Sequence, residues 1–470
     1  MKIYKSLIAY LIFAISTAWI NSGALMAQDA ANEFALPSIE RYILPNGLTV
    51  LLMEQHEVPL INVTLSCNAG AVKDKDMAGL ASITADALTF GTKNYSRETL
   101  EEELDYLGAS LNTSSTLEYS RITSNFLKQD QGKIFELIRE VLIYPVFPDE
   151  ELLKQKQRRL VGLNRAKERP GSVIGTYYNK FVLGNHPLAT PVSGIKSSIE
   201  KISREDVQAF FNSNYKPEGA CLAIVGDFST DEIKKVVNEF FGDWKMGESG
   251  SFTMDKPNIL SNRSRILLVN KEDALETRFQ IGATGIPRNH PDYIPVMIVN
   301  TILGGRFTSW LNDELRVNAG LTYGAWSYFQ YFKESGLFSI SSFTRTNTTV
   351  EAIDLALEVL DRLHSQGIDQ ETLNSAKKYL KGLFPLRYEN GESLARLLNE
   401  MFIYDFDESF VNDFMEKVDA VDIRQAKSII KKYFPENNLQ FVLIGKASEI
   451  KNQVEKYGDL YEKEILEEGF

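Results

Sequence analysis

A repeated set of landmarks is the feature that most limits how this chain can fold. Tyr215-Lys216-Pro217-Glu218 precedes an apolar run at 221–226, and Tyr433-Phe434-Pro435-Glu436, 218 residues later, precedes a similar run at 441–445. An amphipathic stretch and an aromatic-Gly-Asp sequence follow each run at nearly the same offset. A constant offset across several landmarks indicates internal duplication. Two copies of about two hundred residues predict paired domains rather than a solenoid.

Strand-like and helix-like patterns alternate within each copy, which predicts an α+β fold. We expect two duplicated domains, each an antiparallel β-sheet flanked by helices, at residues 38–245 and 263–470. A Gly/Ser-rich stretch at 245–251 followed by Pro257 predicts a linker at 246–262. The length of 470 residues suits two such domains.

The N-terminus has the pattern of a secretory signal peptide, predicted at residues 1–27. Lys2 and Lys5 precede an apolar run from Leu7 to Ile20, and small residues follow up to Ala27. The apolar run is short for a membrane anchor, so cleavage is the favoured interpretation. We therefore expect a periplasmic or secreted protein with no membrane span after cleavage.

Charge and cysteine content narrow the classes of function. The formal net charge of −12 argues against nucleic acid as the main partner. Cys67 and Cys221 both fall in strand-like runs, and they could either pair in an oxidising compartment or lie buried separately. The four histidines, His56, His186, His290 and His364, are far apart in sequence and lack partners at metal-ligand spacing.

Several short segments, taken in order, resemble the pitrilysin-type (inverzincin) zinc peptidases, which include insulin-degrading enzymes and the mitochondrial processing peptidase. They are Leu44-Pro45-Asn46-Gly47-Leu48, Asn68-Ala69-Gly70-Ala71, Ala78-Gly79-Leu80-Ala81, His186-Pro187-Leu188 with Gly194, Gly304-Gly305-Arg306-Phe307, and Leu315-Arg316 followed by Gly320-Leu321-Thr322-Tyr323. Asn46-Gly47 is also a hairpin signal by itself. The resemblance implies that the two domains face each other as a clamshell around a peptide-sized cavity.

Active members of that family carry His-x-x-Glu-His directly after Gly-Leu-Ala, with a third, distant glutamate ligand. The corresponding positions here are Ser82, Ala85 and Asp86, and the third ligand position falls at Gly162. A hydroxyl is a poor zinc ligand and a methyl group cannot activate water. We therefore expect a helix that has lost its metal site, with Asp86 as a solvated helix residue. This chain should bind no metal and be inactive alone.

The resemblance also implies a role for residues in the later domain. In the family, an arginine and a tyrosine at the positions of Arg316 and Tyr323 help to hold the substrate carbonyl. The Gly304-Gly305 pair could let a substrate backbone approach closely. The pattern alone favours Arg316 as a surface residue near a helix end and Tyr323 as a half-buried strand residue, and the glycines could be a helix-initiating turn.

These features favour a noncatalytic, substrate-binding subunit of a heteromeric zinc metalloendopeptidase, resembling the partner chain of two-subunit family members. Arg316, Tyr323, Gly304 and Gly305 would contact substrate in trans, and the zinc would sit on a homologous partner subunit carrying His-x-x-Glu-His. The substrates would be unstructured peptides. The alternatives are an inactive peptide-binding or chaperone-like protein and a scaffold of the cell envelope.

Overall fold

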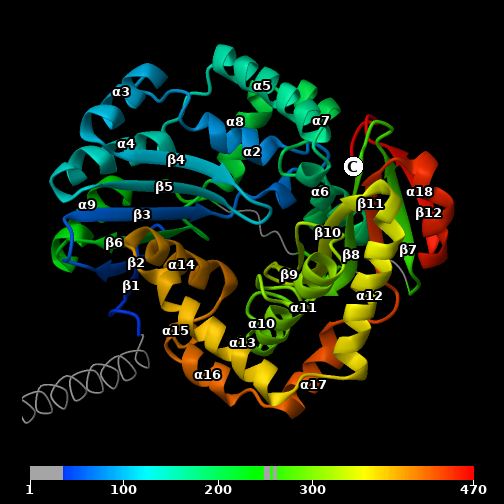
Figure 1. The fold of residues 1–470 in the computed structure, drawn as a ribbon. Helices are drawn as coiled ribbons and strands as arrows, with labels where there is room; N and C mark the ends of the chain where they lie inside the picture. Colours follow the sequence, from blue (N-terminus) through cyan, green and yellow to red (C-terminus); the bar gives the residue numbers. More distant parts are fainter. Residues whose placement is uncertain (1–34, 248–253, 258–261) are drawn as a thin grey trace, which may run out of the picture.

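The computed structural model describes residues 35–247, 254–257 and 262–470. The predicted signal peptide at 1–27 lies outside the described residues, as do parts of the predicted linker at 246–262. The described residues form two six-stranded sheets, each flanked by helices (Figure 1). This confirms the prediction of two related α+β units.

The elements of the first half are β1 (Glu40–Ile43), β2 (Thr49–Glu54), β3 (Leu60–Cys67), η1 (Ala71–Lys73), α2 (Leu80–Ala87), α3 (Arg97–Leu107), β4 (Ser110–Ser115), β5 (Ser120–Leu127), η2 (Lys128–Asp130), α4 (Gln131–Ile143), α5 (Asp149–Lys167), α6 (Pro170–Leu183), η3 (Pro187–Ala189), α7 (Lys196–Lys201), α8 (Arg204–Asn214), β6 (Cys221–Gly226) and α9 (Thr230–Phe241).

The elements of the second half are β7 (Arg265–Asn270), β8 (Glu276–Gly285), α10 (Tyr293–Leu303), α11 (Trp310–Asn312), the π-helical turn η4 (Asp313–Asn318), β9 (Ala325–Tyr331), β10 (Gly336–Arg345), η5 (Thr346–Thr348), α12 (Thr349–Ser365), α13 (Gln370–Leu383), η6 (Pro385–Tyr388), α14 (Gly391–Tyr404), α15 (Ser409–Asn412), α16 (Phe414–Ala420), α17 (Ile423–Tyr433), β11 (Gln440–Gly445), α18 (Ala447–Val454), η7 (Glu455–Tyr457) and β12 (Asp459–Glu464).

The two sheets share one strand order. It is β1-β2-β6-β3-β5-β4 in the first sheet and β12-β7-β11-β8-β10-β9 in the second. The strands predicted from the repeated landmarks, β6 and β11, occupy the same third place and are buried along their whole length. Fully buried strands have apolar residues on both faces, which explains why these runs stood out in the sequence.

The sheets are mainly antiparallel, as predicted, but both also contain parallel neighbours. β2 pairs with β6 in parallel, and so does β7 with β11, because helices separate the two strands of each pair along the chain. At the outer edge β1 runs antiparallel to β2, since the predicted Asn46-Gly47 turn, with Gly47 at φ +90°, joins them. β12 reaches the equivalent edge after α18 and pairs in parallel with β7.

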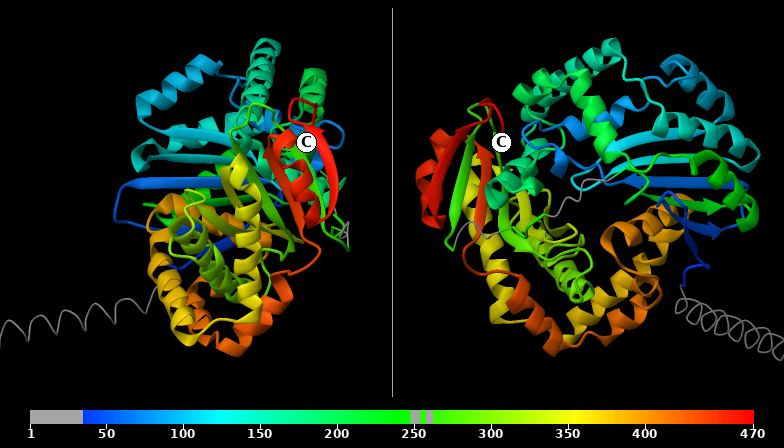
Figure 2. Two further views of the ribbon diagram at one scale, coloured as in Figure 1. Left: turned by 45° about the vertical axis from the view of Figure 1, so that its right-hand side comes forward. Right: turned by 180° about the vertical axis from the view of Figure 1, so that it is seen from behind.

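One helix of each half packs against the sheet of the other half. α14 packs against β3 and β6 of the first sheet, and α6 packs against β8 and β11 of the second (Figures 1 and 2). Both helices contain 14 residues. The opposite face of the first sheet packs in one core with α4 and α9, and that of the second sheet packs with α10 and α12, so each sheet lies between two layers. The halves are therefore interlocked as well as facing each other.

Buried polar side chains anchor the exchanged helices at equivalent positions, 221 residues apart. The Tyr178 hydroxyl on α6 donates to the Phe338 carbonyl at 2.7 Å. The Asn399 amide on α14 donates to the carbonyls of Thr64 and Cys221 at 3.1 and 3.0 Å. Because a buried donor without a partner is costly, these bonds fix where each helix sits on the sheet.

The two cysteines lie on opposite faces of the first sheet. Ser66 of β3 is directly opposite Cys221 of β6, so Cys67, the next residue, points to the other face. Cys67 packs in the core of the first half, while Cys221 packs in the core that includes α14. Both are buried free thiols, which decides between the two alternatives left open by the sequence.

Across the described residues, the structure contains no helix of sufficient length and apolarity to cross a membrane.

Candidate functional site

The helix at the expected metal position begins as predicted. α2 starts after Gly79, whose φ of +98° suits glycine, and the Asp74 carboxylate accepts hydrogen bonds from the backbone N–H groups of Gly79 and Ala81, both at 2.7 Å. These bonds satisfy N–H groups that lack partners in the first turn. Burial raises the pKa of the Asp74 carboxyl to about 7.

The face of α2 that would carry metal ligands is engaged by α5 instead. Arg159 donates from Nη2 to Ser82 Oγ at 2.6 Å and to Asp86 Oδ2. Gln155 donates to the same Asp86 oxygen at 2.6 Å. The Asp86 side chain is 26% exposed and paired, which corrects the expectation of a solvated residue. Ala85 is fully buried.

Gly162, the predicted position of the third ligand, lies exposed on α5. A Cβ at Gly162 would meet nothing within 4 Å. The residue of α5 that does reach α2 is Arg159, three positions earlier. Sequence reasoning missed Arg159 and Gln155 as members of this site. Their spacing, i and i+4 like that of Ser82 and Asp86, was the available signal.

This set of residues does not fit a zinc ion. The one carboxylate is neutralised by a guanidinium, the hydroxyl accepts from the same guanidinium, and Ala85 has no donor atom. Zinc requires imidazole, thiolate or carboxylate ligands that are free to coordinate. Elsewhere in the part of the chain that the structure describes, no group of three or more His, Cys, Asp or Glu side chains is arranged to hold a metal.

Arg316 and Tyr323 lie on successive segments between α10 and β9. Arg316 belongs to η4, and its guanidinium carbon is 4.4 Å from the centre of the Phe307 ring. Tyr323 is 82% exposed and stacks on Phe343 with ring centres 6.5 Å apart. Within the described residues neither side chain makes a hydrogen bond, and no ring contact joins the two. Both keep their donors available to an outside group.

The segment that contains Arg316 is helical but irregular. Trp310 and Leu311 open α11, Phe307 precedes it, and the chain then widens into the π-helical turn. π-Helical turns are rare and often occur at functional sites. Gly320 follows with φ +64°, as expected for a residue that ends a helix.

The Gly304-Gly305 pair packs against the chain itself. A Cβ at Gly304 would lie 2.2 Å from the backbone nitrogen of Ser327, and that N–H donates to the Gly304 carbonyl at 3.2 Å. We expected a substrate backbone to approach Gly304 closely, but β9 occupies that place. This corrects the interpretation of Gly304 as a substrate contact. Gly305 remains exposed.

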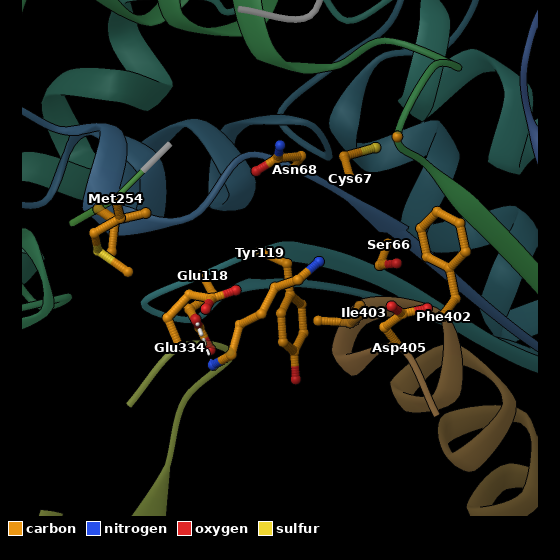
Figure 3. Close-up of a pocket in the computed structure, with 13 residues that line it drawn as sticks. Ser66, Cys67, Asn68, Glu118, Tyr119, Met254, Glu334, Phe402, Ile403 and Asp405 are labelled. Carbon is orange, nitrogen blue, oxygen red and sulfur yellow. Dashed lines mark hydrogen bonds between the residues drawn. The ribbon is translucent and has the colours of Figure 1, made fainter. Parts of the chain in front are cut away.

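A cavity of about 720 Å³ lies between the two halves (Figure 3). The β4–β5 turn contributes Glu118 and Tyr119, the β9–β10 turn contributes Lys333 and Glu334, and the end of α14 contributes Phe402. The Lys333 backbone N–H donates to Glu118 at 2.9 Å, and burial raises the pKa of the Glu118 carboxyl. The sequence predicted a cavity, but no residue could be assigned to it from the sequence, because the lining residues come from distant segments.

Comparison with known proteins places both halves in one family. Residues 49–194 match the family described as Insulinase (Peptidase family M16), and residues 201–380 match the Peptidase M16 inactive domain. A curated relative from Helicobacter pylori, called a non-peptidase homolog YmxG, is 24% identical over 84% of this chain and 91% of its own length. One from Bacillus subtilis, called an uncharacterized zinc protease YmxG, is 21% identical over 85% and 96%.

Solved structures agree with this assignment. The crystal structure of a peptidase M16 inactive domain from Pseudomonas fluorescens superimposes with a TM-score of 0.82 and 25% identity, covering 87% of this chain and 98% of that one. A Helicobacter pylori protease has the same fold, with a TM-score of 0.78 at 19% identity, covering 87% and 100%.

Proposed function

The chain belongs to peptidase family M16, and from that premise we propose that it is the noncatalytic, substrate-binding subunit of a heteromeric zinc metalloendopeptidase. One observation carries the proposal. The polar groups at the former metal position are engaged with one another, whereas Arg316 and Tyr323 present unengaged donors. A chain arranged in this way has the means to hold a substrate and lacks the means to cleave it.

Arg316 and Tyr323 would act on a peptide held at the zinc of a partner subunit. A guanidinium and a phenol are both hydrogen-bond donors, and donors aimed at a carbonyl stabilise the negative charge that develops on its oxygen. The cation–π contact with Phe307 restricts the Arg316 head group without using its N–H donors. The arginine would therefore be positioned before substrate arrives.

The partner would be a homologous M16 subunit carrying His-x-x-Glu-His, and the substrates would be unstructured peptides. The predicted signal peptide supports a periplasmic or secreted location for the complex. Zinc would belong to the partner, and this chain would contain less than one zinc ion per molecule by elemental analysis.

The test is to produce this chain alone, the His-x-x-Glu-His homologue alone, and the two together. We expect co-elution on size-exclusion chromatography and chelator-sensitive cleavage of a long unstructured peptide only by the pair. Cleavage by this chain alone, or full activity of the homologue without it, would contradict the proposal.

A second candidate is an inactive peptide-binding or chaperone-like protein, favoured by the cavity of about 720 Å³ between the halves. Such a protein would bind peptides without a catalytic partner. Peptide binding by the purified chain, combined with failure to associate with the homologue, would favour this function, or a scaffold role in the envelope, over the first.

A further inference from the structure

We propose that Arg159 takes the place of a metal ion in this chain: its guanidinium is the positive centre that joins α2 to α5, and it keeps divalent cations out of this position. This inference concerns the chain by itself and does not depend on the proposed partner.

The contacts of Arg159 define that centre. Its Nη2 donates to both Ser82 and Asp86, and Gln155 donates to the same oxygen of Asp86. The Arg159 and Asp86 side chains are only 18% and 26% exposed. Each helix contributes two residues spaced i and i+4, so all four side chains meet between the helices. The arrangement resembles a metal centre, with ligands from two helices around one cation.

The neighbouring basic residues of α5 are directed elsewhere. Lys156 donates to the carbonyls of Glu200 and Ile202 at 3.0 and 2.6 Å. Arg158 is exposed and donates to the side chain of Gln155 at 3.1 Å. Arg159 is therefore the member of this basic run that faces α2. Lys154, which is exposed and pairs with Glu150 and Glu151 at 2.8 Å, provides a matched control on the same helix.

A guanidinium in this place opposes metal binding in two ways. It occupies the oxygen atoms that a cation would need, and it places a positive charge within a few ångströms of where that cation would sit. Two like charges at contact distance near a protein surface repel strongly enough to weaken binding by about two to three orders of magnitude. Loss of the ligands and presence of Arg159 are thus separate obstacles.

The experiment separates those two obstacles. A ligand-restored chain carries Ser82→His, Ala85→Glu, Asp86→His and Gly162→Glu, and is compared with the same chain carrying in addition either Arg159→Met or Lys154→Met. Zn²⁺ affinity is measured by calorimetric titration after folding is checked by circular dichroism and size-exclusion chromatography. We expect Arg159→Met to raise the affinity about a hundredfold or more, and Lys154→Met to change it less than about threefold.

A second readout tests whether zinc and Arg159 are equivalent. In the ligand-restored chain with Arg159→Met, added Zn²⁺ should raise the melting temperature, because a ligand that binds only the folded state stabilises it. In the chain that retains Arg159, the same Zn²⁺ should leave the melting temperature nearly unchanged. Equal affinities with and without Arg159, whether both tight or both undetectable, would overturn the proposal.

If the ligand-restored chains do not fold, the native chain provides the decisive measurement. A double-mutant cycle between Arg159→Met and Asp86→Asn should show clear coupling in denaturant unfolding, while Lys154→Met with Asp86→Asn should show none. Absence of coupling for Arg159 would mean that it is not the centre of the cluster, and the proposal would be wrong.

Discussion

The α2–α5 cluster and the Arg316–Tyr323 region contrast in how they use their polar groups. In the cluster, Arg159, Asp86 and Ser82 satisfy one another between two helices. In the second region, Tyr323 is 82% exposed and Arg316 rests on an aromatic ring. A polar group that is already paired contributes to stability, whereas one that is exposed and held in place is available for binding. The contrast is therefore between a paired, structural cluster in the first half and exposed hydrogen-bond donors in the second half.

The largest effect is expected from Tyr323→Phe in the complex with the His-x-x-Glu-His homologue. Loss of one donor to a developing oxyanion lowers turnover by about a hundred- to a thousandfold. Arg316→Lys should also fail to restore full turnover, since lysine lacks the planar fork of donors. Tyr106→Phe, at another tyrosine with an exposed ring on α3, serves as the control. If both variants assemble normally and keep wild-type turnover, Arg316 and Tyr323 have a structural role, and the two regions do not differ in the way described above.

Gly304→Ala tests whether the second region depends on its tight backbone packing. A methyl group 2.2 Å from the Ser327 nitrogen must displace β9 or the loop, and overpacking of this kind costs about 1–3 kcal/mol of unfolding free energy. Gly382→Ala on α13, where a Cβ would meet nothing within 4 Å, should be neutral or slightly stabilising. Denaturant unfolding of both variants measures the difference. Equal stability would show that the approach of Gly304 to β9 is not required.

Ser82→Ala tests whether the α2–α5 cluster has a purely structural role. It removes one acceptor of Arg159 while the contact with Asp86 remains, so the free energy of unfolding should fall by about 1 kcal/mol. Turnover by the assembled complex should stay at the wild-type level. A loss of turnover without a loss of stability would assign the cluster a functional role.

The smallest effects are expected in the titration of two histidines, one from each half. Hydrogen bonds to Asp227 and Glu54 raise the pKa of His56, whereas desolvation lowers the pKa of His290. The raised pKa means that His56 stabilises the fold at low pH and that this contribution disappears as pH rises through its folded pKa. His290 acts in the opposite direction and reduces stability as pH falls below about 6.5. NMR titration of the ring carbons should place His56 above His290.

Local sequence signals predicted the repeated units, the Asn46-Gly47 turn, α2 and the buried strands β6 and β11. The turn, the helix and the strands depend on residues close together in the chain, and the repeat is visible because such local patterns recur at a constant offset. The same signals could not show that Asp86 meets Arg159, because these residues are 73 positions apart and their contact depends on how α2 and α5 pack together. Likewise Gly304 carried a turn signal, but its partner Ser327 is set by the position of β9. The exchange of α6 and α14 could not be predicted from the hydrophobic periodicity of these helices, because an apolar helix face has the same pattern whichever sheet it covers.

The helix exchange also bears on the order in which the fold can be completed when the chain emerges with its N-terminus first. The face of the first sheet formed by Leu51, Met53, Ala223 and Val225 packs in the same core as α14. Roughly 165 residues separate the end of β6 at Gly226 from the start of α14 at Gly391. At synthesis rates of about 5–20 residues per second, that apolar face stays uncovered for about 10–30 seconds before α14 has been synthesised. A nascent first half is therefore exposed to aggregation over this interval, and its folding has to be finished by a segment that arrives late.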